Sequence, residues 1–171
     1  MTGTEFLALI RPRIGDSAKT TYDDSELLGY LNDAIIQLSM ERIIGKDPQM
    51  IIEEEVTPGT TTIPARFQCF AGQFPVYFSG GKIMSLDGTV TPLRVRYFAT
   101  KERLSATNGT IPFGDESIPA LTNAVVVMAS ARVGADAQTE GALAMRQTEG
   151  ITIGSSPVGR YARSNQKQIK E

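Results

Sequence analysis

Carboxylates are the side chains of this chain that could do acid–base work or hold a metal, because its 171 residues include no histidine and only one cysteine, Cys69. Without an imidazole there can be no Ser-His-Asp or Cys-His relay, no imidazole base that titrates near neutral pH and no imidazole ligand for a metal. A single thiol forms neither a disulfide framework nor a thiolate metal cluster within one chain. Cys69 is therefore expected to be a small buried hydrophobe.

Two pairs of carboxylates remain as candidates for acid–base work or metal binding. Glu53 and Glu55 would share one face of a strand, and Asp23 and Asp24 are adjacent. Neither pair has complementary ligands at a recognisable spacing. Helix capping by the aspartates and charge at a sheet edge for the glutamates are the favoured interpretations. We therefore expect a protein that is not an enzyme and that binds no cofactor or metal.

The net charge of −2 is unevenly distributed along the chain. Residues 1–156 carry 13 basic and 18 acidic side chains, whereas residues 157–171 carry four basic side chains and one acidic one. This tail contains Arg160, Tyr161, Arg163, Lys167 and Lys170. A basic tail can contact nucleic acid or can simply be a solvated terminus. Its polar composition predicts an unstructured segment in the isolated monomer.

A second basic group surrounds two aromatic residues, Tyr97 and Phe98. Its members are Arg94, Arg96, Lys101 and Arg103. They are weak candidates for non-specific contact with phosphates. Sequence-specific DNA binding would need a recognition helix rich in basic and amide side chains, and the strongest predicted helix instead begins with acidic residues.

Helices are predicted at the start of the chain. Thr2 and Glu5 have the spacing of a capping box, and Pro12 should end or kink the helix that follows. Asp23 is a plausible N-cap for a second, amphipathic helix that runs to about residue 43. No apolar run is long enough for a signal-peptide core or a membrane span, so we expect no membrane association and a cytoplasmic location.

From about residue 49 to 104 the pattern changes to short β-type runs separated by turn signals. Runs at 50–56 and 60–63 flank a Pro-Gly turn, and Gly80-Gly81 separates runs at 75–78 and 82–86. A further run at 92–98 alternates apolar and charged residues. These runs predict a small antiparallel module. Its hairpin carries three candidate contact residues, Tyr77, Phe78 and Lys82.

Helical signals return after residue 116. A helix is predicted from Pro119 to Arg132, and Gly134 separates it from a second one at 135–149. The order predicts an α+β fold: a four-helix bundle with an inserted small antiparallel β module and an extended C-terminal arm. Residues 1–156 would form a single helical domain with the β insertion at about 49–104, and residues 157–171 the arm.

Three stretches together resemble a known family. Segments 6–16 and 22–34 read FLALIRPRIGD and YDDSELLGYLNDA, and segment 115–121 reads DESIPAL before a helix rich in small residues. These stretches resemble the head-to-tail adaptor (connector, or head completion) proteins of tailed bacteriophages. The resemblance covers residues 4–45 and 111–149, about half of the chain.

The resemblance implies a structural virion protein. Such adaptors form a homo-oligomeric ring, a dodecamer, at the neck of the virion, where the ring joins the portal protein to tail or nozzle proteins and extends the channel through which DNA passes non-specifically. The resemblance places the five tail residues from Arg160 to Lys170 in a portal-binding arm. It leaves Tyr77, Phe78 and Lys82 for contact with the tail or a neighbouring subunit. The alternatives are a tail-side completion or interaction module and, further behind, a DNA-binding regulator.

Overall fold

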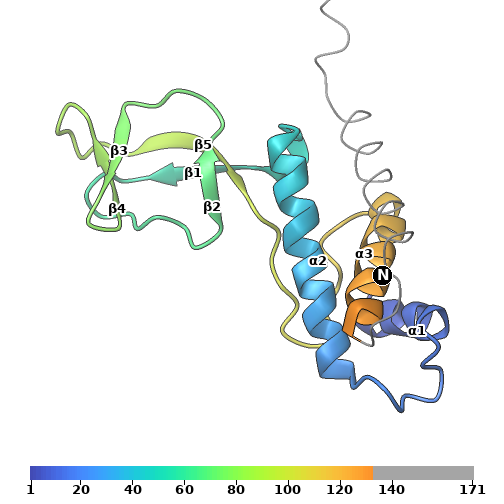
Figure 1. Cartoon of the computed structure of the whole chain (residues 1–171). Helices are drawn as coiled ribbons and strands as arrows, with labels where there is room; N and C mark the ends of the chain where they lie inside the picture. Colours follow the sequence, from blue (N-terminus) through green and yellow to red (C-terminus); the bar gives the residue numbers. More distant parts are fainter. Residues whose placement is uncertain (133–171) are drawn as a thin grey trace, which may run out of the picture.

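The structure, a computed structural model, describes residues 1–132 of the chain. Figure 1 shows its helices gathered on one side and a β module that projects from them. The helices are α1 (Gly3–Arg13), α2 (Asp24–Ile44) and α3 (Ile118–Arg132), with the short 3₁₀ helices η1 (Pro48–Met50) and η2 (Asp115–Ser117). The strands are β1 (Ile51–Val56), β2 (Phe67–Phe70), β3 (Val76–Ser79), β4 (Lys82–Ser85) and β5 (Leu93–Ala99). The segment 135–149 and the tail 157–171 lie outside the described residues.

Local capping explains where the first two helices begin. Thr2 and Glu5 form the predicted capping box at the start of α1. Asp23 caps α2, its carboxylate accepting the amide of Glu26 at 2.6 Å. Pro12 lies in the last turn of α1, and the helix ends one residue later. The predictions for these two helices are confirmed. None of the helices in residues 1–132 is both long enough and apolar enough to cross a membrane.

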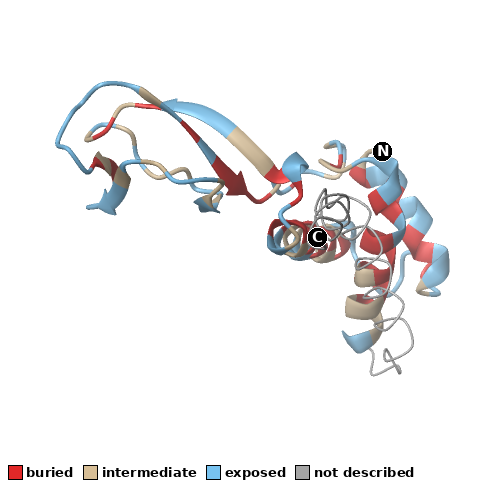
Figure 2. Cartoon of the chain, turned by 90° about the horizontal axis from the view of Figure 1, so that it is seen from above, coloured by how far each residue is buried: buried red, intermediate tan, exposed pale blue. Residues whose placement is uncertain are grey.

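The three helices share one hydrophobic core. Its fully buried side chains include Phe6 and Ile10 of α1, Leu31 of α2 and Leu121 of α3. The connecting segments also contribute apolar residues to this core: Tyr22, Leu104 and Ile111. In Figure 2 the buried positions line the inner faces of the helices. The core is therefore closed by connecting segments as well as by helices.

The β module consists of two antiparallel sheets. One sheet has the order β1-β5-β2, and the other is the hairpin β3-β4. Along β1 and β5, Glu53 lies opposite Arg96 and Glu55 lies opposite Arg94. The hairpin turns at Gly80 and Gly81, whose φ angles of +57° and +74° suit the two-residue turn predicted there. The run at 60–63 forms only an isolated bridge, between Thr62 and Lys82.

The module has its own core, with Val56, Ile83, Val95, Tyr97 and Ala99 buried. A register shift in β2 between Phe67 and Cys69 brings two phenylalanines, Phe67 and Phe70, into this core. Cys69 pairs with Phe98 on the opposite face of the sheet and is exposed. The prediction of a buried Cys69 is wrong, because the bulge reverses the alternation of inward and outward side chains.

The predicted four-helix bundle is also wrong. The described residues form an α+β structure with three helices and five strands in two antiparallel sheets. Besides the helices, the connecting segments contribute Tyr22, Leu104 and Ile111 to the helical core. The β module has a separate core and projects from the helices. As predicted, its strands lie between the second and third helices of the chain.

Candidate functional site

The far end of the β module carries the three hairpin residues predicted as contacts. In the β3-β4 register Tyr77 lies opposite Met84, Phe78 opposite Ile83 and Ser79 opposite Lys82. Tyr77 is 45% exposed and Phe78 is 41% exposed, which is high for large apolar side chains. Lys82 is also exposed. The β3-β4 hairpin lies at the outer part of the module (Figure 1). Its exposed residues include two aromatic rings and one positive charge.

Phe78 is held in place by an aromatic cluster. Its ring stacks on Phe70 at 5.3 Å between centroids and meets Phe67 edge-on at 5.1 Å. Phe67 also lies 5.4 Å from Tyr97. Such ring pairs stabilise beyond the area they bury. Phe78 thus contributes to folding as well as to the surface, whereas Tyr77 lies on the other face of β3.

Two of the predicted phosphate-contact residues, Arg94 and Arg96, lie on the exposed face of β5. Each faces a glutamate of β1 across the sheet, and Arg94 Nη1 lies 3.5 Å from Glu53 Oε1. Opposite charges directly across a sheet attract each other. This face is a ladder of alternating charges, and its potential is not that of a basic patch. Glu53 and Glu55 lie on the edge strand β1, as predicted.

Lys101 and Arg103 lie elsewhere, on the segment that runs from β5 along α2. Lys101 Nζ donates to the carbonyl of Gln49 at 3.1 Å, and Arg103 Nη2 lies 3.4 Å from Asp33 Oδ1. The structure therefore does not bring the four predicted basic residues together. Three of them, Arg94, Lys101 and Arg103, each bind a partner within the chain.

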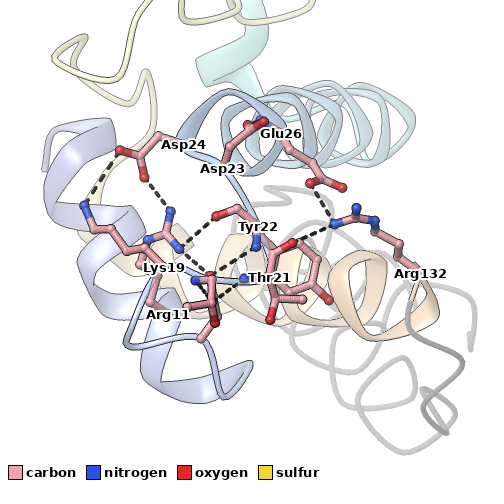
Figure 3. Close-up of polar contacts among 10 residues, drawn as sticks. Arg11, Lys19, Thr21, Tyr22, Asp23, Asp24, Glu26 and Arg132 are labelled. Atoms are coloured by element: carbon pink, nitrogen blue, oxygen red, sulfur yellow. Dashed lines mark hydrogen bonds and ion pairs between the residues drawn. The ribbon is translucent and has the colours of Figure 1, made fainter.

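A buried network lies where α1, the following loop and α2 meet (Figure 3). Arg11 donates to the carboxylate of Asp16, to the carbonyl of Tyr22 at 3.2 Å and to Asp24 at 2.5 Å. Asp16 also accepts the amides of Thr20 and Thr21 at 2.8 and 2.9 Å. The hydrogen bonds from these backbone amides, above all the one from Thr21, keep the pKa of Asp16 below its ordinary value. The network fixes the α1–α2 turn.

Arg132, the last residue of α3, joins this region from the other side. It donates to the carbonyl of Thr21 at 3.1 Å and to Glu26 at 2.8 Å, and its guanidinium lies over the ring of Tyr22. The Tyr22 hydroxyl in turn donates to the carbonyl of Ala129 at 2.6 Å. Arg132 is therefore anchored to Glu26 at the start of α2 and to the loop before it (Figure 3).

Sequence reasoning did not single out Arg11, Asp16 or Arg132. The usable signal was Asp16 itself, which follows Gly15 and precedes a segment rich in serine and threonine, a composition typical of turns closed by an aspartate side chain. The arginines gave no such signal, because arginine is mostly exposed in proteins.

Among residues 1–132, no group of three or more Cys, Asp or Glu side chains is arranged to hold a metal ion. A hollow of about 110 Å³ lies beside α1 and is lined in part by Leu7, Arg11 and Lys19. Ligand pockets commonly measure ~300–1,000 Å³, so this hollow is small by comparison.

The predicted arm residues lie outside the part of the chain that the structure describes: Arg160, Tyr161, Arg163, Lys167 and Lys170. The other two predicted surfaces, the basic group from Arg94 to Arg103 and the β3-β4 hairpin, lie within the described residues. No protein-family model matches the sequence, and no curated protein matches it significantly.

Proposed function

We propose that this chain is a head-to-tail adaptor of a tailed bacteriophage. It acts as one copy of a homo-oligomeric ring in the neck of the virion, between the portal protein and the tail or nozzle proteins. The ring extends the channel through which DNA passes. The protein works by its shape and contacts and transforms no molecule.

The observation that carries this proposal is the separation of the fold into two parts with different surfaces. The helical body has one core and the β module has another, and the module projects from the body (Figure 1). The outer hairpin of the module exposes Tyr77 and Phe78. Exposed aromatic residues are enriched where proteins bind other proteins. A subunit of this form can contact one neighbour through its helices and another through its module.

Charge supports the same proposal. Residues 1–132 carry 12 basic and 15 acidic side chains. A channel wall with a net negative charge repels the DNA backbone, so that DNA slides through it without adhering. The paired arginines of β5 fit this role better than that of a DNA-binding regulator, because phosphate contact would require basic side chains free of acidic neighbours.

In this proposal the basic tail 157–171 is the portal-binding arm. Its residues follow α3, whose last residue Arg132 is anchored to the loop before α2 and to α2 itself. The β module then contacts tail components or neighbouring subunits, with Tyr77, Phe78 and Lys82 in that contact.

Two variants test the proposal, because each should lose a different binding partner. Deletion of residues 157–171 should abolish binding to portal-containing capsids and leave binding to tail proteins intact. Tyr77→Ala should weaken binding to tails or between subunits and leave portal binding intact. Native mass spectrometry of the full chain, alone and with portal, should show a ring in the portal complex.

The contrary outcomes are specific. Unchanged portal affinity of the truncated protein would refute the arm assignment. Cross-links from Lys82 to the portal protein would contradict the proposed orientation, whereas cross-links to tail proteins alone, without portal binding, would favour a tail-side completion module. Particles that lack the protein but show sealed necks and normally attached tails would refute the adaptor role.

A further inference from the structure

The helical body and the β module are joined by two stretches of chain. One runs from the end of α2 through η1 into β1, and the other runs from β5 to the segment along α2. Between the two large cores lies a small third cluster, in which Ile43, Met50 and Phe98 are buried. The packing between body and module is therefore slight compared with the packing inside each.

On the second connection, the change from module to body falls between two adjacent residues. The amide of Thr100 donates to the carbonyl of Arg66 in the module at 3.1 Å. The amide of Lys101 donates instead to the hydroxyl of Ser39 in α2 at 3.1 Å. Further along, Leu104 is fixed to Asn32 through both its amide and its carbonyl, at 2.7 and 3.0 Å. Residues from Lys101 onward thus belong to the body.

On the first connection, the chain turns sharply just after α2. Lys46 adopts a φ of +56°, in the left-handed region that few residues other than glycine occupy. The amides of Gly45, Lys46 and Asp47 all donate to carbonyls of the last turn of α2. The direction in which the chain leaves the helix is set over these few residues. Hinges in proteins are commonly such short stretches at the ends of elements.

Arg42 links the two sides of this junction. On the module side its Nη1 lies 3.4 Å from Asp47 and donates to Gln49 at 3.1 Å. On the body side its Nη2 donates to Ser117 at 2.6 Å and lies 3.6 Å from Glu116.

The Arg42 side chain is only 2% exposed, and its guanidinium lies 5.0 Å from the centre of the Phe113 ring. Its Nε has no partner among the described residues. One buried cation thus holds η1, at the base of the module, against η2, at the start of α3. Because a buried charge that loses a partner is strongly disfavoured, the guanidinium resists separation of the two sides.

We propose that the β module turns as a single body relative to the helices, on a hinge formed by residues 45–46 and 100–101, and that Arg42 locks it at the angle seen. Rotation at the hinge need not disturb either large core, because each lies wholly on one side of it. The outer hairpin moves furthest in such a rotation. The inference concerns the fold and does not depend on the adaptor role.

Distance measurements between spin labels test this lock in the full chain. Cys69, exposed on β2, is the natural labelling site on the module, and Ala8→Cys on the exposed side of α1 gives the second site. With Arg42 intact, electron–electron double resonance should give a single narrow distribution of distances. Arg42→Met, which replaces the cation by a shorter apolar side chain without hydrogen-bond donors, should at least double the width of that distribution or shift its mean.

Arg103→Gln is the matched control, because it removes an arginine from an exposed ion pair with Asp33 on the body. This control should keep the narrow distribution. Circular dichroism and a cooperative thermal transition establish that each variant is folded. A folded Arg42→Met protein with the parent distribution would overturn the proposal.

If Arg42→Met does not fold, the double variant Glu116→Gln, Ser117→Ala decides the question. It keeps Arg42 with its module-side partners and removes those on the body side. A broadened distribution supports the lock, and an unchanged one overturns it.

Discussion

Arg11 and Asp16 form an ion pair in which both side chains are almost completely buried, at 5% and 1% exposure. The pair closes the turn between α1 and α2, and Arg11 extends it to Asp24 at 2.5 Å. A buried pair of this kind adds little net stability when compared with apolar residues in its place, but the loss of one partner leaves an uncompensated charge. The turn therefore depends on both residues together.

Arg11→Ala should destabilise the protein by about 3–5 kcal/mol, because it strands Asp16 in the interior. Chemical denaturation followed by circular dichroism measures this. Lys19→Ala is the matched control. The Lys19 ammonium lies 3.8 Å from Asp24 and its side chain is 63% exposed, so its removal should change stability by less than ~1 kcal/mol. Equal effects of the two substitutions would contradict the role assigned to Arg11.

The same network predicts sensitivity to acid. The amides of Thr21, Thr20 and Tyr22 lower the pKa of Asp16 below its ordinary value of 3.8, and the hydrogen bond from Arg11 lowers the pKa of Asp24. Groups with a lowered pKa stabilise the fold fully above the ordinary value, and this contribution disappears as the pH falls through the lowered one. The denaturant concentration at the midpoint of unfolding should therefore decrease when the pH is lowered below about 4. In Asp16→Asn, less stable at neutral pH, that acid-dependent decline should be shallower.

Alanine should have opposite effects at two exposed glycines, one in the β3-β4 hairpin turn and one in α2. Gly81 has a φ of +74°, so Gly81→Ala should destabilise the β module by about 1–2 kcal/mol. Gly29 lies within α2 with open space around it, so Gly29→Ala should stabilise the protein by about 0.5–1 kcal/mol. Hydrogen exchange of the amides of β3 and β4 measures the first effect, and thermal denaturation the second. Faster exchange in both variants would be inconsistent with this assignment.

Tyr77 and Phe78 should separate binding from folding. Phe78→Ala removes two ring contacts and should cost about 1–3 kcal/mol. Tyr77→Ala removes an exposed side chain and should change stability by no more than ~0.5 kcal/mol. Both should reduce binding to tail proteins or neighbouring subunits, as measured by co-sedimentation. A Tyr77→Ala protein that binds both as the parent does would remove the hairpin from the contact.

Deprotonation of Tyr97 at high pH should destabilise the β module. Burial and the hydrogen bond that its hydroxyl donates to Glu54 at 2.7 Å raise its pKa from 10.0 to about 12. A raised pKa means that this stabilisation is complete below pH 10 and is lost as the pH rises toward 12. Tyr97→Phe should show a shallower decline of stability over that interval. Denaturation midpoints of the two proteins at a series of pH values make the comparison.

The helices were predictable because their signals are local. The capping residues Thr2 and Asp23 lie within three residues of the groups they bond, and the apolar spacing of α2 is visible within its own segment. The Gly80-Gly81 hairpin was predictable for the same reason. In contrast, β2 escaped detection because its bulge breaks the alternation of side chains that identifies a strand.

The contacts of Arg42 and Arg132 were not predictable because their partners come from distant parts of the chain. Arg42 bonds Ser117, 75 residues away, and Arg132 bonds Glu26, 106 residues away. Nothing in the sequence near Arg42 distinguishes it from an exposed arginine. The four-helix prediction failed for a related reason, since the contributions of Tyr22, Leu104 and Ile111 to the helical core depend on tertiary packing alone.

The contacts of Arg132 have a mechanical consequence. The last turn of a helix ordinarily frays, and a load applied there would unwind it first. Here tension on the backbone beyond residue 132 passes through the guanidinium to Glu26 and to the Thr21 carbonyl, and through the Tyr22 hydroxyl to Ala129. Traction at Arg132 is thus shared with Glu26 in the first turn of α2 and with the Thr21 carbonyl just before that helix.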